Sequence, residues 1–116
     1  MHKLLFIMSK SPITINAQEA FDALLMGSAF ADCSVLFIGD GVYQLLQAQK
    51  PETLGAKNYT LGFPALSDYG VKRVYCSKSQ LTSLKINSSE LAIPVDQLDD
   101  LEINQLITQQ HKVLSF

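Results

Sequence analysis

The sequence predicts an α/β fold in which helices cover both faces of a mostly parallel β-sheet. Apolar runs of strand length alternate with stretches of helical periodicity five times along the chain. The first two runs, residues 3–8 and 34–38, are nearly continuous in apolar residues, as expected for strands buried on both faces. A chain of 116 residues fits one domain and leaves no room for two. We therefore expect a single domain over residues 1–116 with right-handed crossovers.

The first half of the chain predicts two strands and two helices. After the first strand comes a loop over residues 9–12, and residues 17–30 have the apolar spacing of a helix, with Asn16 as its candidate N-cap. The second strand ends at residues 39–41, where glycine permits a positive φ and a helix can begin. A short helix is expected over residues 42–47.

The second half begins with its least regular stretch. Residues 51–60 are expected to form a loop, and residues 65–69 a short helix. The remaining elements alternate in type: a strand over 71–76, a helix over 77–84, a strand over 91–95, a helix over 98–110 and a strand over 112–116.

Composition restricts the classes of partner. Hydrophobic residues make up 47% of the chain and charged residues only 17%, which is more apolar than a small monomer buries. Either both sheet faces are covered, or some apolar surface is reserved for a partner. Nine basic and eleven acidic residues give a net charge of -2, and no window is strongly basic. We therefore expect no direct nucleic-acid binding by this chain.

The termini and cysteines indicate a cytoplasmic protein. The apolar run before Ser9 and Lys10 is too short for a signal-peptide core or a membrane span. Two cysteines, Cys33 and Cys76, are too few for a disulfide framework and lack the paired spacing of a zinc site. We expect reduced thiols, no membrane contact and a soluble chain.

Cys76 is the one residue whose setting resembles that of a nucleophile. It ends the third predicted strand, just before a predicted helix, at the sheet edge where parallel folds place their sites. The positive end of the helix dipole, with Lys78 and Arg73 nearby, would lower the pKa of its thiol. The alternative is a cysteine that serves as a small apolar core residue. Cys33, at the opposite end of a strand, is expected to be structural.

The other polar clusters favour structural roles. Residues 39–41 match neither a dinucleotide fingerprint nor a P-loop, so they predict a turn. His2 and His111 have no partner spaced for a metal or a triad, and His111 fits a helix end. The acidic residues near the last helix are expected to cap it rather than bind metal: Asp96, Asp99, Asp100 and Glu102. No metal and no cofactor are expected.

A pattern over residues 40–51, D-G-V-x-Q-L-L-x-x-Q-K-P, points to a known family. Residues 19–26, Tyr59, Phe63, Leu66, residues 69–71 and residues 113–116 extend the match to essentially the full length. The chain resembles the TusC (DsrF-like) branch of the DsrE/F/H family of sulfur-relay proteins.

The resemblance implies a three-layer α/β/α fold with a five-stranded parallel sheet and a place in a complex. It implies a heterohexamer with TusB-like and TusD-like subunits, built as a dimer of heterotrimers. Such a complex takes persulfide sulfur from a TusA-like carrier and passes it through a TusE-like carrier toward 2-thiouridine at the tRNA wobble position. It also implies that this chain reaches tRNA only indirectly.

Within that complex the resemblance implies a mainly structural or accessory, non-catalytic subunit. The D-type subunit holds the principal sulfur-carrying cysteine at the end of its third strand, and Cys76 stands in the corresponding place. Residues expected to support subunit packing are Asp40, Val42, Tyr43, Leu45, Leu46, Tyr59, Phe63 and Tyr69. The alternatives are a stand-alone cysteine-dependent sulfurtransferase and a DsrF-type subunit in dissimilatory sulfur oxidation.

Overall fold

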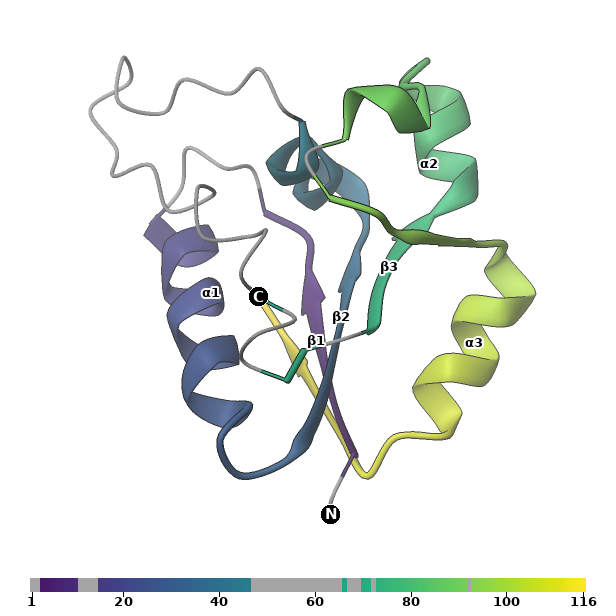
Figure 1. Ribbon diagram of the computed structural model, residues 1–116. Coiled ribbons are helices and arrows are strands. Elements are labelled where there is room, and N and C mark those ends of the chain that lie inside the picture. Colours follow the sequence, from purple (N-terminus) through teal and green to yellow (C-terminus); the bar gives the residue numbers. More distant parts are fainter. Residues whose placement is uncertain (1–2, 11–14, 47–65, 67–69, 72, 92) are drawn as a thin grey trace.

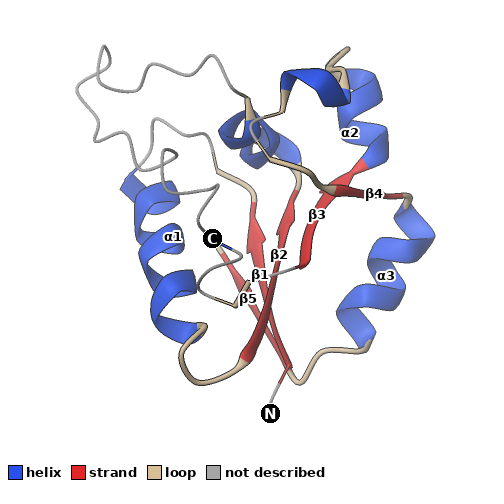
Figure 2. Ribbon diagram, viewed as in Figure 1, coloured by secondary structure: helices blue, strands red, loops and turns tan. Residues whose placement is uncertain are grey.

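Five parallel strands form one sheet in the order β4-β3-β2-β1-β5 (Figures 1 and 2). The computed structural model describes residues 3–10, 15–46, 66, 70–71, 73–91 and 93–116. The strands are β1 (Lys3–Met8), β2 (Asp32–Phe37), β3 (Arg73–Ser77), β4 (Asp96–Leu98) and β5 (Lys112–Ser115). The predicted five-stranded parallel sheet is therefore confirmed.

Helices lie on both faces of this sheet, which gives the three layers (Figure 1). They are α1 (Ile15–Gly27), the 3₁₀ helix η1 (Gly39–Leu45), α2 (Lys78–Ser83), the short 3₁₀ turn η4 (Ser88–Glu90) and α3 (Asp100–Thr108). α1 connects β1 to β2 on one face, and α3 crosses the other face to bring the chain to β5 (Figure 2).

Side chains along each strand point alternately to the two faces of the sheet, and a core lies on each face. The larger core, under α1, includes Phe6, Met8, Val35, Phe37, Ala20, Phe21 and Leu24. The smaller core, under α3, has Leu5, Ile7 and Leu36 buried, with Ile103, Leu106 and Ile107 of α3 packed against them. Because consecutive residues of β1 and β2 point to opposite faces and both faces are covered, these strands are apolar throughout.

The predicted strand over residues 91–95 was wrong. β4 lies beyond Pro94, at Asp96–Leu98, because proline has no N–H to donate to a neighbouring strand. Leu91 instead forms an isolated antiparallel bridge with Leu46.

Helix boundaries also differ from the prediction by a few residues. α1 begins at Ile15, ahead of the predicted cap at Asn16, and ends at Gly27 rather than at residue 30. The helix expected over 42–47 is the 3₁₀ helix η1, which begins three residues earlier. The short helix expected over 65–69 falls, apart from Leu66, outside the described residues.

Asp99 and Glu102 cap α3 reciprocally, as expected for acids at a helix start. The Glu102 N–H donates to Asp99 Oδ1 at 2.8 Å, and the Asp99 N–H donates to Glu102 Oε1 at 3.1 Å. α3 therefore starts at Asp100, not at residue 98. Asp96 was misassigned to this cap, because it begins β4 instead.

Two glycines place η1 against the end of β1. Gly39 has a φ of +53°, in the left-handed region that disfavours a side chain. A Cβ on Gly41 would overlap the backbone carbonyl group of Met8, so only glycine fits there. The Gly41 N–H donates to the Ile38 carbonyl at 2.9 Å, which closes the turn.

We expect Gly41→Ala to destabilise the fold by about 3 kcal/mol or more, because its methyl group would overlap the β1 backbone. Gly39→Ala should lower the free energy of unfolding by about 1–2 kcal/mol, because its only penalty is the positive φ at this position. Urea denaturation of both variants measures the difference. Equal losses in the two variants would contradict the close approach at Gly41.

Asp99→Ala should lower the free energy of unfolding by about 1 kcal/mol, because it removes the acceptor for the Glu102 N–H. Asp96→Ala removes the same charge from β4 without affecting a helix cap, and serves as the control. The comparison uses the same denaturation assay. A loss at Asp96→Ala as large as that at Asp99→Ala would indicate a general charge effect.

Candidate functional site

The carboxyl ends of β1, β2 and β3 meet η1 and α2 at one end of the sheet, which we call the carboxyl edge. Parallel folds form their sites at this end of the strands. Gln44 of η1 joins these parts. Its side chain is only 1% exposed, and its Nε2 donates to the Lys10 carbonyl at 2.9 Å. This bond fixes η1 to the loop after β1. Gln44 was predicted only as part of the family pattern, although a glutamine among apolar neighbours was a signal for a buried polar contact.

Cys76 lies beneath this edge rather than on it. It is 0% exposed, belongs to the large core, and its Sγ donates weakly to the Ser77 carbonyl at 3.8 Å. Burial raises the pKa of its thiol to about 11, because the thiolate would lose its hydration. The thiol is therefore protonated near neutral pH.

The prediction that a helix dipole lowers the pKa of Cys76 was wrong. Ser77, not Cys76, is the N-cap of α2, and its hydroxyl accepts the Gln80 N–H at 3.3 Å. The expected cations also act elsewhere. The Arg73 guanidinium lies 3.8 Å from the Asp32 carboxylate at the opposite end of β3, and Lys78 is exposed on α2.

A hollow of about 560 Å³ lies between α2 and the start of α3. Its lining residues are Lys78, Ser79, Thr82, Ser83, Asp99 and Asp100. The Ser79 hydroxyl lies 3.1 Å from that of Ser77 and donates to Asp100 Oδ1 at 3.4 Å. Cys76 does not line this hollow, so the hollow does not give solvent a route to the thiol.

The residues expected to support subunit packing divide into two layers. Asp40 and Tyr43 are exposed on η1, and Leu46 is half-buried. Val42 and Leu45 are buried in this chain's own core, so they support η1 from beneath and do not themselves face a partner. The other expected positions, Tyr59, Phe63 and Tyr69, lie outside the described residues.

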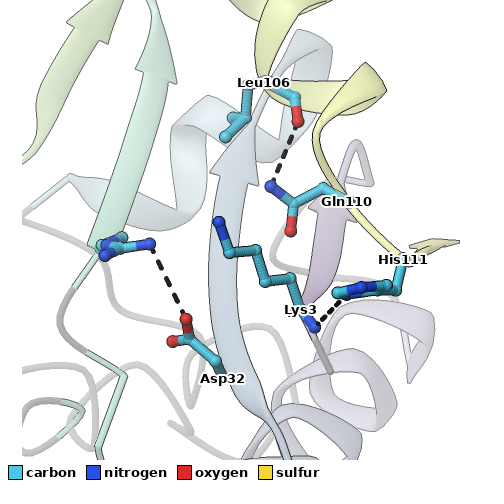
Figure 3. Close-up of polar contacts among 6 residues, drawn as sticks. Lys3, Asp32, Leu106, Gln110 and His111 are labelled. Atoms are coloured by element: carbon cyan, nitrogen blue, oxygen red, sulfur yellow. Dashed lines mark hydrogen bonds and ion pairs between the residues drawn. The ribbon is translucent and has the colours of Figure 1, made fainter. Parts of the chain in front are cut away.

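The second cysteine and His111 lie away from this edge. Cys33 is buried at the start of β2, and burial, followed by the nearby Asp32 charge, raises the pKa of its thiol. His111 Nδ1 accepts the Lys3 backbone N–H at 2.8 Å, so the ring joins the start of β5 to that of β1 (Figure 3). His2 lies outside the described residues.

Among the residues that the structure describes, no three or more His, Cys, Asp or Glu side chains form a group that could hold a metal ion. No helix in this part of the chain has the length and apolarity to cross a membrane.

Comparison with solved structures supports the fold. The E. coli ychN protein superimposes over all of both chains with a TM-score of 0.74 at 22% identity. MTH1491, a protein of unknown function from Methanobacterium thermoautotrophicum, gives a TM-score of 0.72 at 16% identity over the same full coverage. At these identities the similarity shows the fold alone.

Sequence comparison is more specific. The chain is 34% identical to Protein TusC of Buchnera aphidicola and 32% identical to a TusC homolog of Aliivibrio fischeri, over all of both chains in each case. It is 31% identical to the intracellular sulfur oxidation protein DsrF of Allochromatium vinosum, over 98% of this chain and 96% of that one. Residues 2–116 match the DsrE/DsrF-like family, and with this full-length similarity the chain belongs to that family.

Proposed function

We propose that this chain is the TusC-like subunit of a cytoplasmic sulfur-relay complex that passes persulfide sulfur toward 2-thiolation of the tRNA wobble uridine. The observation that carries the proposal is the similarity to proteins named TusC, which extends over the whole of both chains. Two free cysteines suit a reducing compartment. A net charge of -2 suits a subunit that reaches tRNA only through its partners.

Its role in the complex is structural or accessory. Persulfide transfer requires a thiolate that attacks the outer sulfur and releases the donor thiol. With a pKa of about 11, roughly 0.03% of Cys76 would be thiolate near pH 7.5, and that fraction is enclosed by apolar side chains. The sulfur is therefore carried by another subunit, and this chain supplies binding surface and stability.

The partners follow from this role. TusB-like and TusD-like subunits complete a heterohexamer, a TusA-like protein delivers the sulfur, and a TusE-like protein takes it on. Asp40 and Tyr43, exposed on η1 at the carboxyl edge, are the described residues that we expect to contact these proteins. No cofactor is needed, because the sulfur passes between thiols.

A DsrF-type subunit in sulfur oxidation is the second candidate. It is supported by the 31% identity to the Allochromatium vinosum protein, which nearly equals the identity to the TusC proteins. A stand-alone sulfurtransferase is less well supported, because such an enzyme needs an accessible thiolate and the thiol of Cys76 is buried.

Co-expression with the TusB-like and TusD-like proteins of the same organism should yield a stable heterohexamer, because the proposed role is subunit assembly. Native mass spectrometry of the purified complex measures the stoichiometry. A chain that stays a monomer or forms only homo-oligomers in the presence of those partners would refute the proposed assembly.

We expect Cys76→Ala to keep the relay active, because the thiol neither ionises near neutral pH nor reaches solvent. A strain that lacks this gene should lose tRNA 2-thiouridine and regain it with either wild-type or Cys76→Ala protein, with Cys33→Ala as the matched control. Mass spectrometry of digested tRNA gives the readout. If wild type restores 2-thiouridine and Cys76→Ala does not, although the variant assembles, the thiol carries sulfur. If deletion leaves 2-thiouridine unchanged while sulfur oxidation fails, the DsrF-type role holds.

The rate of alkylation of the purified protein tests whether the Cys76 thiol is ionised and accessible. Because the folded pKa of Cys76 is raised, its thiolate fraction is very small at pH 8 and rises only as the pH approaches 11. Iodoacetamide should therefore modify Cys76 at least about 100-fold more slowly than glutathione at pH 8. Peptide mapping distinguishes Cys76 from Cys33. Rapid alkylation of Cys76 at pH 8 would show an ionised, accessible thiol.

A further inference from the structure

The residue that follows β5 is fastened to the end of β1. The Phe116 N–H donates to the Ile7 carbonyl at 2.9 Å, and the Phe116 ring stacks on the Phe6 ring with the centroids 6.0 Å apart. The main-chain oxygen of Phe116 accepts two bonds from a single residue, since the Ser9 N–H and the Ser9 hydroxyl each donate to it at 2.9 Å. Phe116 thus holds Ser9 through both its backbone and its side chain.

The residues on either side of Ser9 bond to η1 and to the residue before it. The Met8 carbonyl accepts the N–H of Ile38, the N-cap of η1, at 3.1 Å. The Lys10 carbonyl accepts the side-chain amide of Gln44, within η1, at 2.9 Å. Ser9 therefore lies in the middle of a short segment that joins the end of β5 to η1.

The direction of the Lys10 carbonyl depends on the backbone at Ser9. Peptide groups are planar and are linked only through rotation at each Cα, so a change at Ser9 would move the Lys10 carbonyl relative to Gln44. Gln44 is 1% exposed, and a hydrogen bond lost by a buried amide is costly because water does not replace it. The two bonds from Ser9 to Phe116 oppose that change.

We propose that Ser9 is a positioning residue for η1, and that the end of β5 holds η1 in its binding orientation through Ser9, Lys10 and Gln44. The inference rests on the proposed function in one respect, because Asp40 and Tyr43 of η1 are the residues that we expect to contact partner proteins. The end of the edge strand and the binding surface then form one coupled unit, so loosening one loosens the other.

Hydrogen–deuterium exchange of the purified chain, read by NMR, tests the coupling. Ser9→Ala removes the hydroxyl and keeps the N–H. It should speed exchange of the Gly41 and Leu46 amides at η1 about 3- to 10-fold, the change expected for one net hydrogen bond. Ser9→Thr keeps the hydroxyl and should exchange like wild type. Ser28→Ala is the matched control, because the half-buried Ser28 hydroxyl also donates to a main-chain carbonyl, that of Leu25 at 2.7 Å, and should leave η1 unchanged.

A double-mutant cycle tests the route through Gln44. Gln44→Met removes the amide with little change in volume, so the Lys10 carbonyl loses this donor. In that background, adding Ser9→Ala should change exchange at η1 by less than about twofold, because the bond through which Ser9 acts is already absent. An equally large effect of Ser9→Ala in both backgrounds would overturn the proposed route.

The complex with the TusB-like and TusD-like proteins tests whether the coupled surface binds. Assembly should slow exchange of the Gly41 amide in η1. It should also slow the Ser9 and Phe116 amides, because an energetic coupling acts equally in both directions. In Gln44→Met, assembly should still slow the Gly41 amide but leave the Ser9 and Phe116 amides unchanged.

The outcomes separate this inference from the proposed function. If Ser9→Ala leaves exchange at η1 as unchanged as Ser28→Ala does, Ser9 does not position η1, and the proposed function stands. If wild type forms the heterohexamer without slowing the Gly41 amide, η1 is not the binding surface, which overturns the inference but not the relay role. If wild type forms no heterohexamer, the proposed function fails together with the binding role of η1, and exchange in the isolated variants decides the coupling alone.

Discussion

The close approach of Gly41 to the Met8 carbonyl is the constraint on which the carboxyl edge of this molecule depends. With no side chain at Gly41, η1 lies directly on the end of β1. Val42 and Leu45 of η1 then enter the same buried core as Cys76. The buried Gln44 amide holds the arrangement through the Lys10 carbonyl. A backbone contact thus determines the environment of a thiol on a different strand, and a thiol enclosed this way stays protonated.

The two faces of the sheet are unequally closed. Under α1 the core contains many fully buried side chains, whereas under α3 the buried ones among the described residues are Leu5, Ile7 and Leu36. No residue of α3 is fully buried, and Leu101 is exposed on it. Met26 and Phe30 near the end of α1 and Leu101 on α3 are large apolar side chains that stay exposed. Both features suit a subunit that completes its burial in a complex.

Sequence reasoning recovered the fold class because strand burial on both faces leaves a direct pattern in residues 3–8 and 34–38. Boundaries were less accurate where local signals conflicted. Leu91 and its neighbours have strand-like composition, but Pro94 moves the strand to Asp96–Leu98. Gly39 and Gly41 were recognised as a turn, yet the contact with Met8 could not be foreseen, because it joins segments far apart in sequence.

The candidate site was predicted less well than the fold. Cys76 was placed correctly at the end of β3, but the direction of its side chain depends on the register of the strand, which sequence position alone does not determine. One residue of shift would have put the thiol on the other face. Burial then reversed the expected direction of the pKa shift. The exposure of Phe30 was not predicted, since residue 30 was counted as part of a helix that in fact ends at Gly27.

The strand order has a consequence for the newly made chain. β1 lies between β2 and β5, and Leu5 of β1 pairs with Val113 of β5. During synthesis, therefore, one side of β1 stays without its neighbour until residues 112–115 have left the ribosome. Contacts between such distant segments close late and slow the search for the native state. Until then the apolar edge of β1 is open to chaperones and to other unfinished chains.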